Sequence, residues 1–168
     1  MSEQMTFTDL APGSLKTWFM EIRGPFLLLS FVLAPIGTAI AWHEGSFHWG
    51  YFLLAWVGAI LAHVSVNVFN EYFDYLSGLD FQTQKTPFSG GSGILTAGLI
   101  EPRKVYLLGA ACLFVDAVIG AYFVIVQGWG LIPVILLGGL FAYFYTPYLS
   151  RWQIGELSAG LGLGSLVV

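Results

Sequence analysis

The sequence predicts an all-α protein, a polytopic bundle of transmembrane helices, and three observations lead to this prediction. Of the 168 residues, 57% are hydrophobic and only 10% are charged, with a mean hydropathy of +0.76. Four apolar segments approach or exceed the roughly 20 residues that a helix needs to cross a bilayer. All the basic residues can be placed in connections on one side of these segments. Such a chain is too apolar for an ordinary soluble domain.

The four predicted spans are joined by two short connections and one long loop. In the first, Pro25 suits an opening helical turn and Pro35 is expected to bend the helix. The second continues beyond the length of the membrane core, so its last turns are expected to reach the surface before Gly78 ends it. A fifth span begins near Leu157 and is cut off at Val168, which makes the chain look like a fragment. The four complete spans are predicted at residues 24–42, 49–73, 105–126 and 128–148.

The basic residues predict the orientation in the membrane. The two connections on the opposite side, residues 43–48 and the region around Gln127, contain no lysine or arginine. The positive-inside rule therefore predicts an integral protein of the cytoplasmic membrane, with a cytoplasmic tail at residues 1–15 and a cytoplasmic loop after the second span. Six scattered basic residues form no extended patch, which argues against nucleic-acid binding. They are Lys16, Arg23, Lys85, Arg103, Lys104 and Arg151.

A polar stripe at the end of the second span is the main candidate site. At about 100° per residue, His63, Asn67, Asn70 and Asp74 fall within an arc of about 60°, with Glu71 at its edge. Oxygen ligands on one helical face suit a hard cation such as Mg²⁺. Carboxylates are costly to keep where a helix leaves a bilayer, so they indicate a functional site, and a metal-bound phosphate is the ligand that most needs two acids.

The long loop at residues 77–103 is a second candidate region. Residues 86–93 are rich in glycine and hydroxyl groups, which could present donors to a phosphate, or could simply form a flexible linker. Asp80 and Lys85 favour the functional interpretation, because they add an acid and a cation near the same membrane face.

Other polar residues have two interpretations each. Asp116, near the middle of the third span, is either a proton-relay group or a protonated acid bonded to a neighbouring helix. Tyr145, at the end of the fourth span, either contacts substrate or anchors the membrane interface. His63 is expected to be a neutral histidine bonded between helices, and Cys112 a small packing residue.

The segment Asn70-Glu-Tyr-Phe-Asp74-Tyr-Leu-Ser-Gly-Leu-Asp80 resembles the first aspartate-rich motif of the UbiA family of intramembrane aromatic prenyltransferases. Lys85 and residues 86–93 are similar to the loop that follows this motif, particularly in the branch of the 1,4-dihydroxy-2-naphthoate polyprenyltransferases of menaquinone synthesis. Residues 145–156 are similar to the region after the fourth helix. Glu71 stands where the family more often has aspartate, a change that keeps the charge and lengthens the reach.

The resemblance implies that residues 16–168 are the N-terminal part of one transmembrane domain with about nine helices, whose second aspartate-rich motif lies beyond this chain. It also implies Mg²⁺-dependent transfer of a polyprenyl group from a prenyl diphosphate to a small aromatic acceptor in quinone biosynthesis. Dihydroxynaphthoate is the expected acceptor, while hydroxybenzoate, homogentisate and a non-aromatic lipid stay open. A separate C-terminal half is a conceivable partner besides the bilayer.

By the same resemblance, site residues are assigned to three roles. Catalysis is assigned to Asn70 and Asp74. Metal binding is assigned to Asn67, Asn70, Glu71, Asp74 and Asp80, and substrate binding to Lys85, Arg151, Tyr145 and Arg23. Arg23 also has a simpler interpretation as a positive-inside anchor. Two alternatives remain: a transporter or ion-conducting module that uses the intramembrane carboxylates, and a noncatalytic truncated subunit.

Overall fold

The computed structural model describes residues 10–83 and 91–144, and within these ranges the regular elements are all helical. In chain order they are α1 (Leu15–Glu21), η2 (Gly24–Leu27), α2 (Leu28–His43), α3 (Trp49–Ser77), η3 (Leu79–Phe81), α4 (Pro102–Gln127), η4 (Trp129–Leu131) and α5 (Ile132–Phe144), where η marks a 3₁₀-helix. The predicted helical fold class is confirmed.

Three of these helical segments are long and apolar enough to cross a membrane. They are Gly24–His43, Trp49–Ser77 and Pro102–Gln127. A shorter apolar segment, Trp129–Phe144, occupies most of the predicted fourth span, whose last residues lie outside the described part of the chain. The predicted fifth span also lies outside it. The chain is therefore an integral membrane protein with the predicted order of spans.

The ends of the spans differ from the prediction by a few residues. The helix of the second span continues past its apolar run to Ser77, as predicted, because an α-helix satisfies its own backbone and does not need the bilayer. Gly78 ends it as predicted, with a left-handed φ of 77° and an N–H that bonds back to the last turn. The third span begins earlier, at Pro102, a residue that suits the first turn of a helix.

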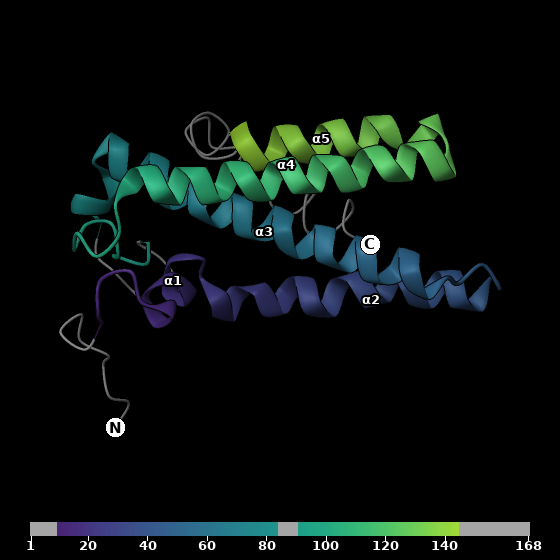
Figure 1. Cartoon of the computed structure of the whole chain (residues 1–168), viewed down its shortest axis with the longest axis horizontal. Coiled ribbons are helices and arrows are strands. Elements are labelled where there is room, and N and C mark those ends of the chain that lie inside the picture. The colour runs from purple at the N-terminus through teal and green to yellow at the C-terminus, as the bar shows by residue number, and fades with distance from the viewer. Residues whose placement is uncertain (1–9, 84–90, 145–168) are drawn as a thin grey trace, which may run out of the picture.

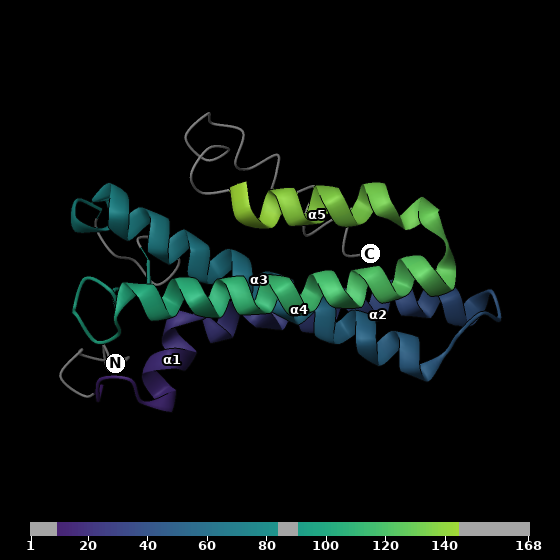
Figure 2. The same ribbon diagram turned by 45° about the horizontal axis from the view of Figure 1, so that its top comes forward.

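The long helices lie side by side, with α3 between α2 and α4 (Figure 1). The most extensive packing joins α3 and α4, and α5 runs beside α4 and also contacts α3 (Figures 1 and 2). The short α1, η3 and the start of α4 all lie at one end of the bundle (Figure 1). The polar stripe of α3 belongs to this end.

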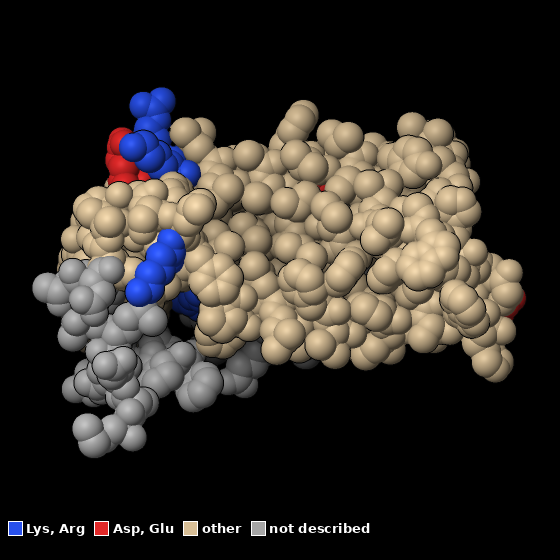
Figure 3. Space-filling view, turned by 60° about the horizontal axis from the view of Figure 1, so that its bottom comes forward, with Lys and Arg blue, Asp and Glu red and all other residues tan. Residues whose placement is uncertain are grey.

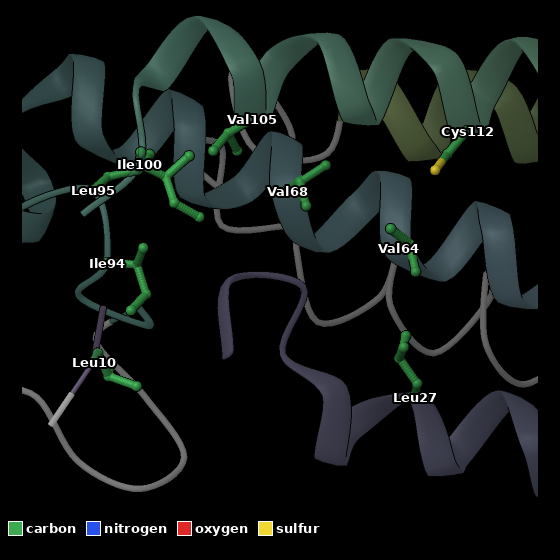
Figure 4. Packing of buried hydrophobic residues seen from close by; sticks show 9 residues of the cluster. All are labelled: Leu10, Leu27, Val64, Val68, Ile94, Leu95, Ile100, Val105 and Cys112. Atoms are coloured by element: carbon green, nitrogen blue, oxygen red, sulfur yellow. The ribbon is translucent and has the colours of Figure 1, made fainter. Parts of the chain in front are cut away.

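The buried core lies where the N-terminal segment and the loop before α4 cover α3. Its residues come from α3 and α4, from η2, from residue 10 before α1 and from residues 94–100, as Figure 4 shows. Cys112 belongs to this core, so its predicted packing role is confirmed. The core residues are Leu10, Leu27, Val64, Val68, Ile94, Leu95, Ile100, Val105 and Cys112.

Away from this end, large apolar side chains face outward. Ile125 is 83% exposed and Trp129 is 80% exposed, which suits a surface solvated by lipid. On the face in Figure 3, the basic side chains gather at one end of the molecule and the broad middle is uncharged. This distribution agrees with the predicted one-sided placement of basic residues, while the side of the membrane on which they lie stays a prediction.

Candidate active site

The polar stripe of α3 divides into two neighbouring columns, each made of residues four apart. Asn67 and Glu71 form the first column, and both side chains are buried. Asn70 and Asp74 form the second, and both are half-buried. Residues four apart lie on the same helical face, and the two columns are separated by about 60°. The predicted stripe therefore exists, but its members have different surroundings.

Glu71 is bonded from two directions. From one side, Arg23 Nε donates to Glu71 Oε1 over 2.7 Å and completes a salt bridge. From the other side, the Ser92 backbone N–H donates to both carboxylate oxygens, over 2.8 and 3.0 Å, and Ser92 Oγ donates to Oε2 over 2.9 Å. Only 1% of the Glu71 surface remains exposed. The carboxylate thus joins α3 to two segments that are distant in sequence.

Arg23 lies in the corner between α1 and η2, residues 21–24. Its φ of 53° and ψ of 49° place it in the left-handed region, which costs a non-glycine residue about 1 kcal/mol or more. This backbone turns the side chain toward α3, where Nη2 also donates to Asn70 Oδ1 over 3.0 Å. Arg23 therefore contacts both columns, which goes beyond the simple membrane anchor. Its predicted contact with substrate stays a prediction.

Asn67 contacts the same corner. Its Nδ2 donates to the carbonyl of Ile22 over 2.9 Å, and Ile22 is the residue that ends α1. The last carbonyls of a helix lack partners within the helix, so this bond satisfies one of them. Deeper in the bundle, His63 Nδ1 and Ser30 Oγ share a hydrogen bond of 2.8 Å between α3 and α2, which confirms the predicted interhelical bond of His63.

Glu21 is a further acid at this site that the sequence analysis did not single out. It is completely buried, and Oε1 has no hydrogen-bond partner among the described residues. Burial, and secondarily the charge of Glu71, raises the pKa of Glu21 to about 8. At neutral pH the side chain is therefore mainly the neutral acid. In the sequence, the position of Glu21 just before an apolar span could have drawn attention to it. Its burial became visible only with the position of α1 in the structure.

Ser92 explains how two carboxyl groups lie close together. Its Oγ is 3.0 Å from Glu21 Oε2 and 2.9 Å from Glu71 Oε2, and it accepts from the Ile94 N–H over 3.1 Å. A hydroxyl has one hydrogen and can donate it to only one carboxyl group at a time. The proton on neutral Glu21 satisfies the other contact, so Glu21, Ser92 and Glu71 form a chain that ends at Arg23.

In the structure, Ser92 of the glycine-rich loop donates its hydrogen bonds to a carboxylate of the protein, that of Glu71. Gly91 has a φ of +72°, and a Cβ there would lie 3.0 Å from Asp80 Oδ1 and 3.2 Å from Glu71 Oε2. Glycine therefore lets the loop pass between the two acids. Asp80 is itself buried. The part of this loop at residues 84–90, including Lys85, lies outside the described residues, as do Tyr145 and Arg151.

The acids at this end do not form an all-protein metal cage. Within residues 10–83 and 91–144, no three His, Cys, Asp or Glu side chains are placed to hold an ion together. Mg²⁺ is commonly held by only one or two carboxylates, together with substrate phosphates and water. A site of this kind needs only one or two of the acids at this end, and Asn70, Asp74 and Asp80 stay predicted ligands.

Asp116 lies away from these residues, in the middle of α4. Its Oδ1 would be 3.0 Å from a Cβ at Gly58, so it faces α3 where that helix has no side chain. The two interpretations of Asp116 both stay predictions.

Comparison with known proteins identifies the family. The sequence model of the UbiA prenyltransferase family matches residues 27–168, which is most of the chain. The chain belongs to the UbiA prenyltransferase family. This assignment confirms the resemblance that was based on the motif around Asn70 and Asp74. Both columns of α3 lie within the matched residues.

Two curated proteins are similar to this chain. A 1,4-dihydroxy-2-naphthoate octaprenyltransferase of Bacillus subtilis is 30% identical over 145 residues, which cover 84% of this chain and 45% of that protein. The enzyme of the same description from Escherichia coli is 28% identical over 107 residues, which cover 63% of this chain and 35% of that protein. The chain thus spans less than half the length of these relatives. No solved structure matches it significantly.

Proposed function

We propose that this chain is the N-terminal part of an enzyme that transfers a polyprenyl group from a prenyl diphosphate to an aromatic acceptor in quinone biosynthesis. The similarity to two naphthoate octaprenyltransferases supports this proposal and favours 1,4-dihydroxy-2-naphthoate as the acceptor. The observation that carries it is the Asn70–Asp74 column, which lies within the family match at the end of a membrane span. A cytosolic diphosphate could reach this end, while its isoprenoid tail stayed in the bilayer.

The proposed chemistry is ionisation of an allylic C–O bond with departure of the diphosphate, followed by attack of an electron-rich ring carbon on the resulting carbocation. That carbon then loses the group it carried, a proton or a carboxyl group as CO₂, which restores the aromatic ring. Mg²⁺, when bound, would supply positive charge that neutralises the departing diphosphate. Asp74, Asp80 and Asn70 are the described residues that would hold it. The sequence also predicts Asn67 and Glu71 as ligands. Both oxygens of Glu71 already accept hydrogen bonds from Arg23 or Ser92, and the Asn67 amide donates to the Ile22 carbonyl, whereas Asn70 Oδ1 accepts one bond from Arg23.

The residues of the chain itself have three further tasks in this proposal. The apolar faces of the helices around the polar end exclude water, which would otherwise consume a carbocation. Lys85 as a point charge and Arg151 as a planar fork are proposed to hold the diphosphate oxygens. Tyr145 is proposed to contact substrate.

The test is transfer from a radiolabelled polyprenyl diphosphate to dihydroxynaphthoate in liposomes. The chain is assayed alone and extended through its natural reading frame, with Mg²⁺ or with EDTA. Asp74→Asn is expected to lower the rate at least about 100-fold, because it removes one charge from a site that stabilises a leaving diphosphate. Glu101→Gln is the matched control, since Glu101 is an exposed acid at the same end that pairs only loosely with Lys104, over 3.6 Å.

Normal turnover by Asp74→Asn would remove this residue from the proposed site. Activity of the extended version alone would support the noncatalytic-fragment interpretation of the shorter chain. The transporter alternative predicts cation flux that does not depend on prenyl diphosphate, and membership of a prenyltransferase family argues against it.

A further inference from the structure

Asn67 and Glu71 are both buried and bonded to segments that are distant in sequence, and these bonds indicate the role of their column. We propose that Glu71, together with Asn67, is a positioning residue that holds the corner at residues 21–24 and the turn at residues 91–94 against α3, and that it is not a magnesium ligand. The proposal rests on the proposed function and removes Asn67 and Glu71 from the residues predicted to bind the metal.

The first argument is the hydrogen-bonding capacity of Glu71. A carboxylate offers about four lone-pair sites, and Glu71 accepts from Arg23 Nε, from the Ser92 N–H with both oxygens, and from Ser92 Oγ. A cation could bind only after Arg23 or Ser92 had left.

The second argument is that Asn67 repeats the pattern one turn deeper. Its amide nitrogen is held by the Ile22 carbonyl at the end of α1. Both members of the column therefore contact the same corner, Asn67 through Ile22 and Glu71 through Arg23. Asn67 and Glu71 each bond to the corner at residues 21–24. Two bonds at different points orient the corner more firmly than one bond would, because a single bond still allows rotation about itself.

The third argument is the contact between the columns. Arg23 Nη2 donates to Asn70 Oδ1, so the position of that amide depends on Arg23, and Arg23 depends on Glu71 and on its own left-handed backbone. Outer-shell partners of this kind orient the groups that bind a metal or substrate. Glu71 would thus act on the reaction through Arg23 and Asn70, without touching the ion.

The first experiment measures thermal unfolding in detergent with EDTA, so that no metal contributes. The protein, expressed in its natural reading frame, carries Arg23→Gln, Glu71→Gln or both. Arg23→Gln is expected to lower the midpoint most, because it leaves a buried carboxylate unpaired. The double variant should be more stable than Arg23→Gln alone. The matched control is the exposed pair Glu101 and Lys104, for which the effects of single and double substitutions to glutamine should add.

Additive effects at Arg23 and Glu71, or a higher midpoint for Glu71→Gln alone, would overturn the proposal. The second outcome is the one expected of a metal ligand, since acids gathered for a cation repel one another when the cation is absent. If Arg23→Gln or Glu71→Gln does not fold, Ser92→Ala tests the proposal in its place, because it removes only a neutral hydroxyl donor to Glu71.

The second experiment measures binding of Mg²⁺ with inorganic pyrophosphate by calorimetry. Ser92→Ala frees one lone pair of Glu71. If Glu71 were a ligand, this variant would bind Mg²⁺ tighter, by about tenfold. A positioning Glu71 predicts affinity equal to or weaker than that of the unsubstituted protein, together with a lower midpoint in EDTA. Asp74→Asn is the comparison variant that should lose binding.

A kinetic measurement separates positioning from a purely structural role. At a temperature well below every midpoint, Glu71→Gln should lower kcat by about tenfold, because Asn70 is no longer held by an oriented Arg23. An unchanged kcat would overturn the positioning role. If the unsubstituted protein neither binds Mg²⁺ nor transfers prenyl groups, the proposed function fails, but the EDTA experiment still decides whether Glu71 holds the corner.

Discussion

The two ends of α3 are held by different kinds of interaction, although they belong to one helix. At the polar end, Asn67 and Glu71 are buried by other segments of the chain and bonded to them. At the apolar end, Trp56 stacks on Phe52 with ring centroids 5.5 Å apart and meets the edge of Phe31 at 5.1 Å. Nearby, Leu53 is about half exposed.

This difference shows what a membrane helix needs from the rest of the chain. Lipid solvates apolar side chains, so the apolar end requires few specific neighbours. Lipid offers no partners to amides and carboxylates, so the polar end must find them within the protein. Substitutions at the polar end should therefore have large and specific effects, and those on the lipid-facing surface small ones.

The largest effect on stability is expected where α4 approaches the polar half of α3. A Cβ at Gly109 would lie 2.8 Å from Val68 Cγ2 and 3.0 Å from Phe69 Cε1, so Gly109→Val should push the helices apart and cost about 3 kcal/mol. A Cβ at Gly120, nearer the other end, would meet only Ile135, at 3.1 Å, so Gly120→Val should cost about 1 kcal/mol. Denaturant unfolding in detergent measures both, and equal losses would contradict the comparison.

The next effect concerns the loop that covers the polar end. Gly91 and Gly98 have nearly the same positive φ, +72° and +70°, but only Gly91 lies against side chains, those of Asp80 and Glu71. Gly98→Ala should therefore cost only the backbone strain, about 1 kcal/mol, and Gly91→Ala about 2 kcal/mol. Thermal unfolding of the two variants tests this. A smaller loss at Gly91 would mean that the loop does not press on the acids.

A smaller effect is expected from pH. The pKa of Glu21 is about 8 in the fold against an ordinary 4.5, because of burial and the charge of Glu71, with Asp80 adding to the rise and Arg23 opposing it. The folded state therefore binds this proton more strongly, and its stabilising effect is complete below about pH 4.5 and is lost as the pH rises through about 8. Near neutrality the loss is about 1 kcal/mol per pH unit.

Glu21→Gln removes this titration and keeps a donor for Ser92. In EDTA, its unfolding midpoint should change less than that of the unsubstituted protein between about pH 6 and about pH 8. Parallel profiles of the two proteins would show that Glu21 is already charged in the fold.

The smallest effect is expected on the lipid-facing surface. Ile125 is 83% exposed, so Ile125→Ala should change the free energy of unfolding by no more than about 0.5 kcal/mol. Val105, with no exposed surface, is the comparison: Val105→Ala should cost about 2 kcal/mol, because it leaves a cavity. A large loss at Ile125 would indicate that another part of the protein covers this face.

Much of the fold could be predicted because its signals are local. A run of apolar residues long enough to cross a bilayer predicts a span wherever it occurs, and Gly78 ended α3 where a left-handed residue was expected. The exact boundaries were less predictable, since α4 begins at Pro102, before the apolar run from which its span was predicted.

The candidate site was predictable only in part. Helical periodicity places His63, Asn67, Asn70 and Asp74 near one face, but it contains no information about what faces them. Glu71 looked like a metal ligand on the edge of a stripe, and the structure shows it bonded to Arg23 and Ser92, which lie 48 and 21 residues away in sequence.

The sequence by itself determined the helical membrane fold, the family and the helical face that carries the polar groups, because composition, motif and periodicity are properties of neighbouring residues. Only the tertiary structure decided which of those polar groups are already bonded, because their partners come from distant segments. It was the left-handed turn at Arg23 and the glycine at position 91 that brought Arg23 and Ser92 onto Glu71. On those contacts rests our proposal that Asn67 and Glu71 hold the corner while Asp74 serves the substrate.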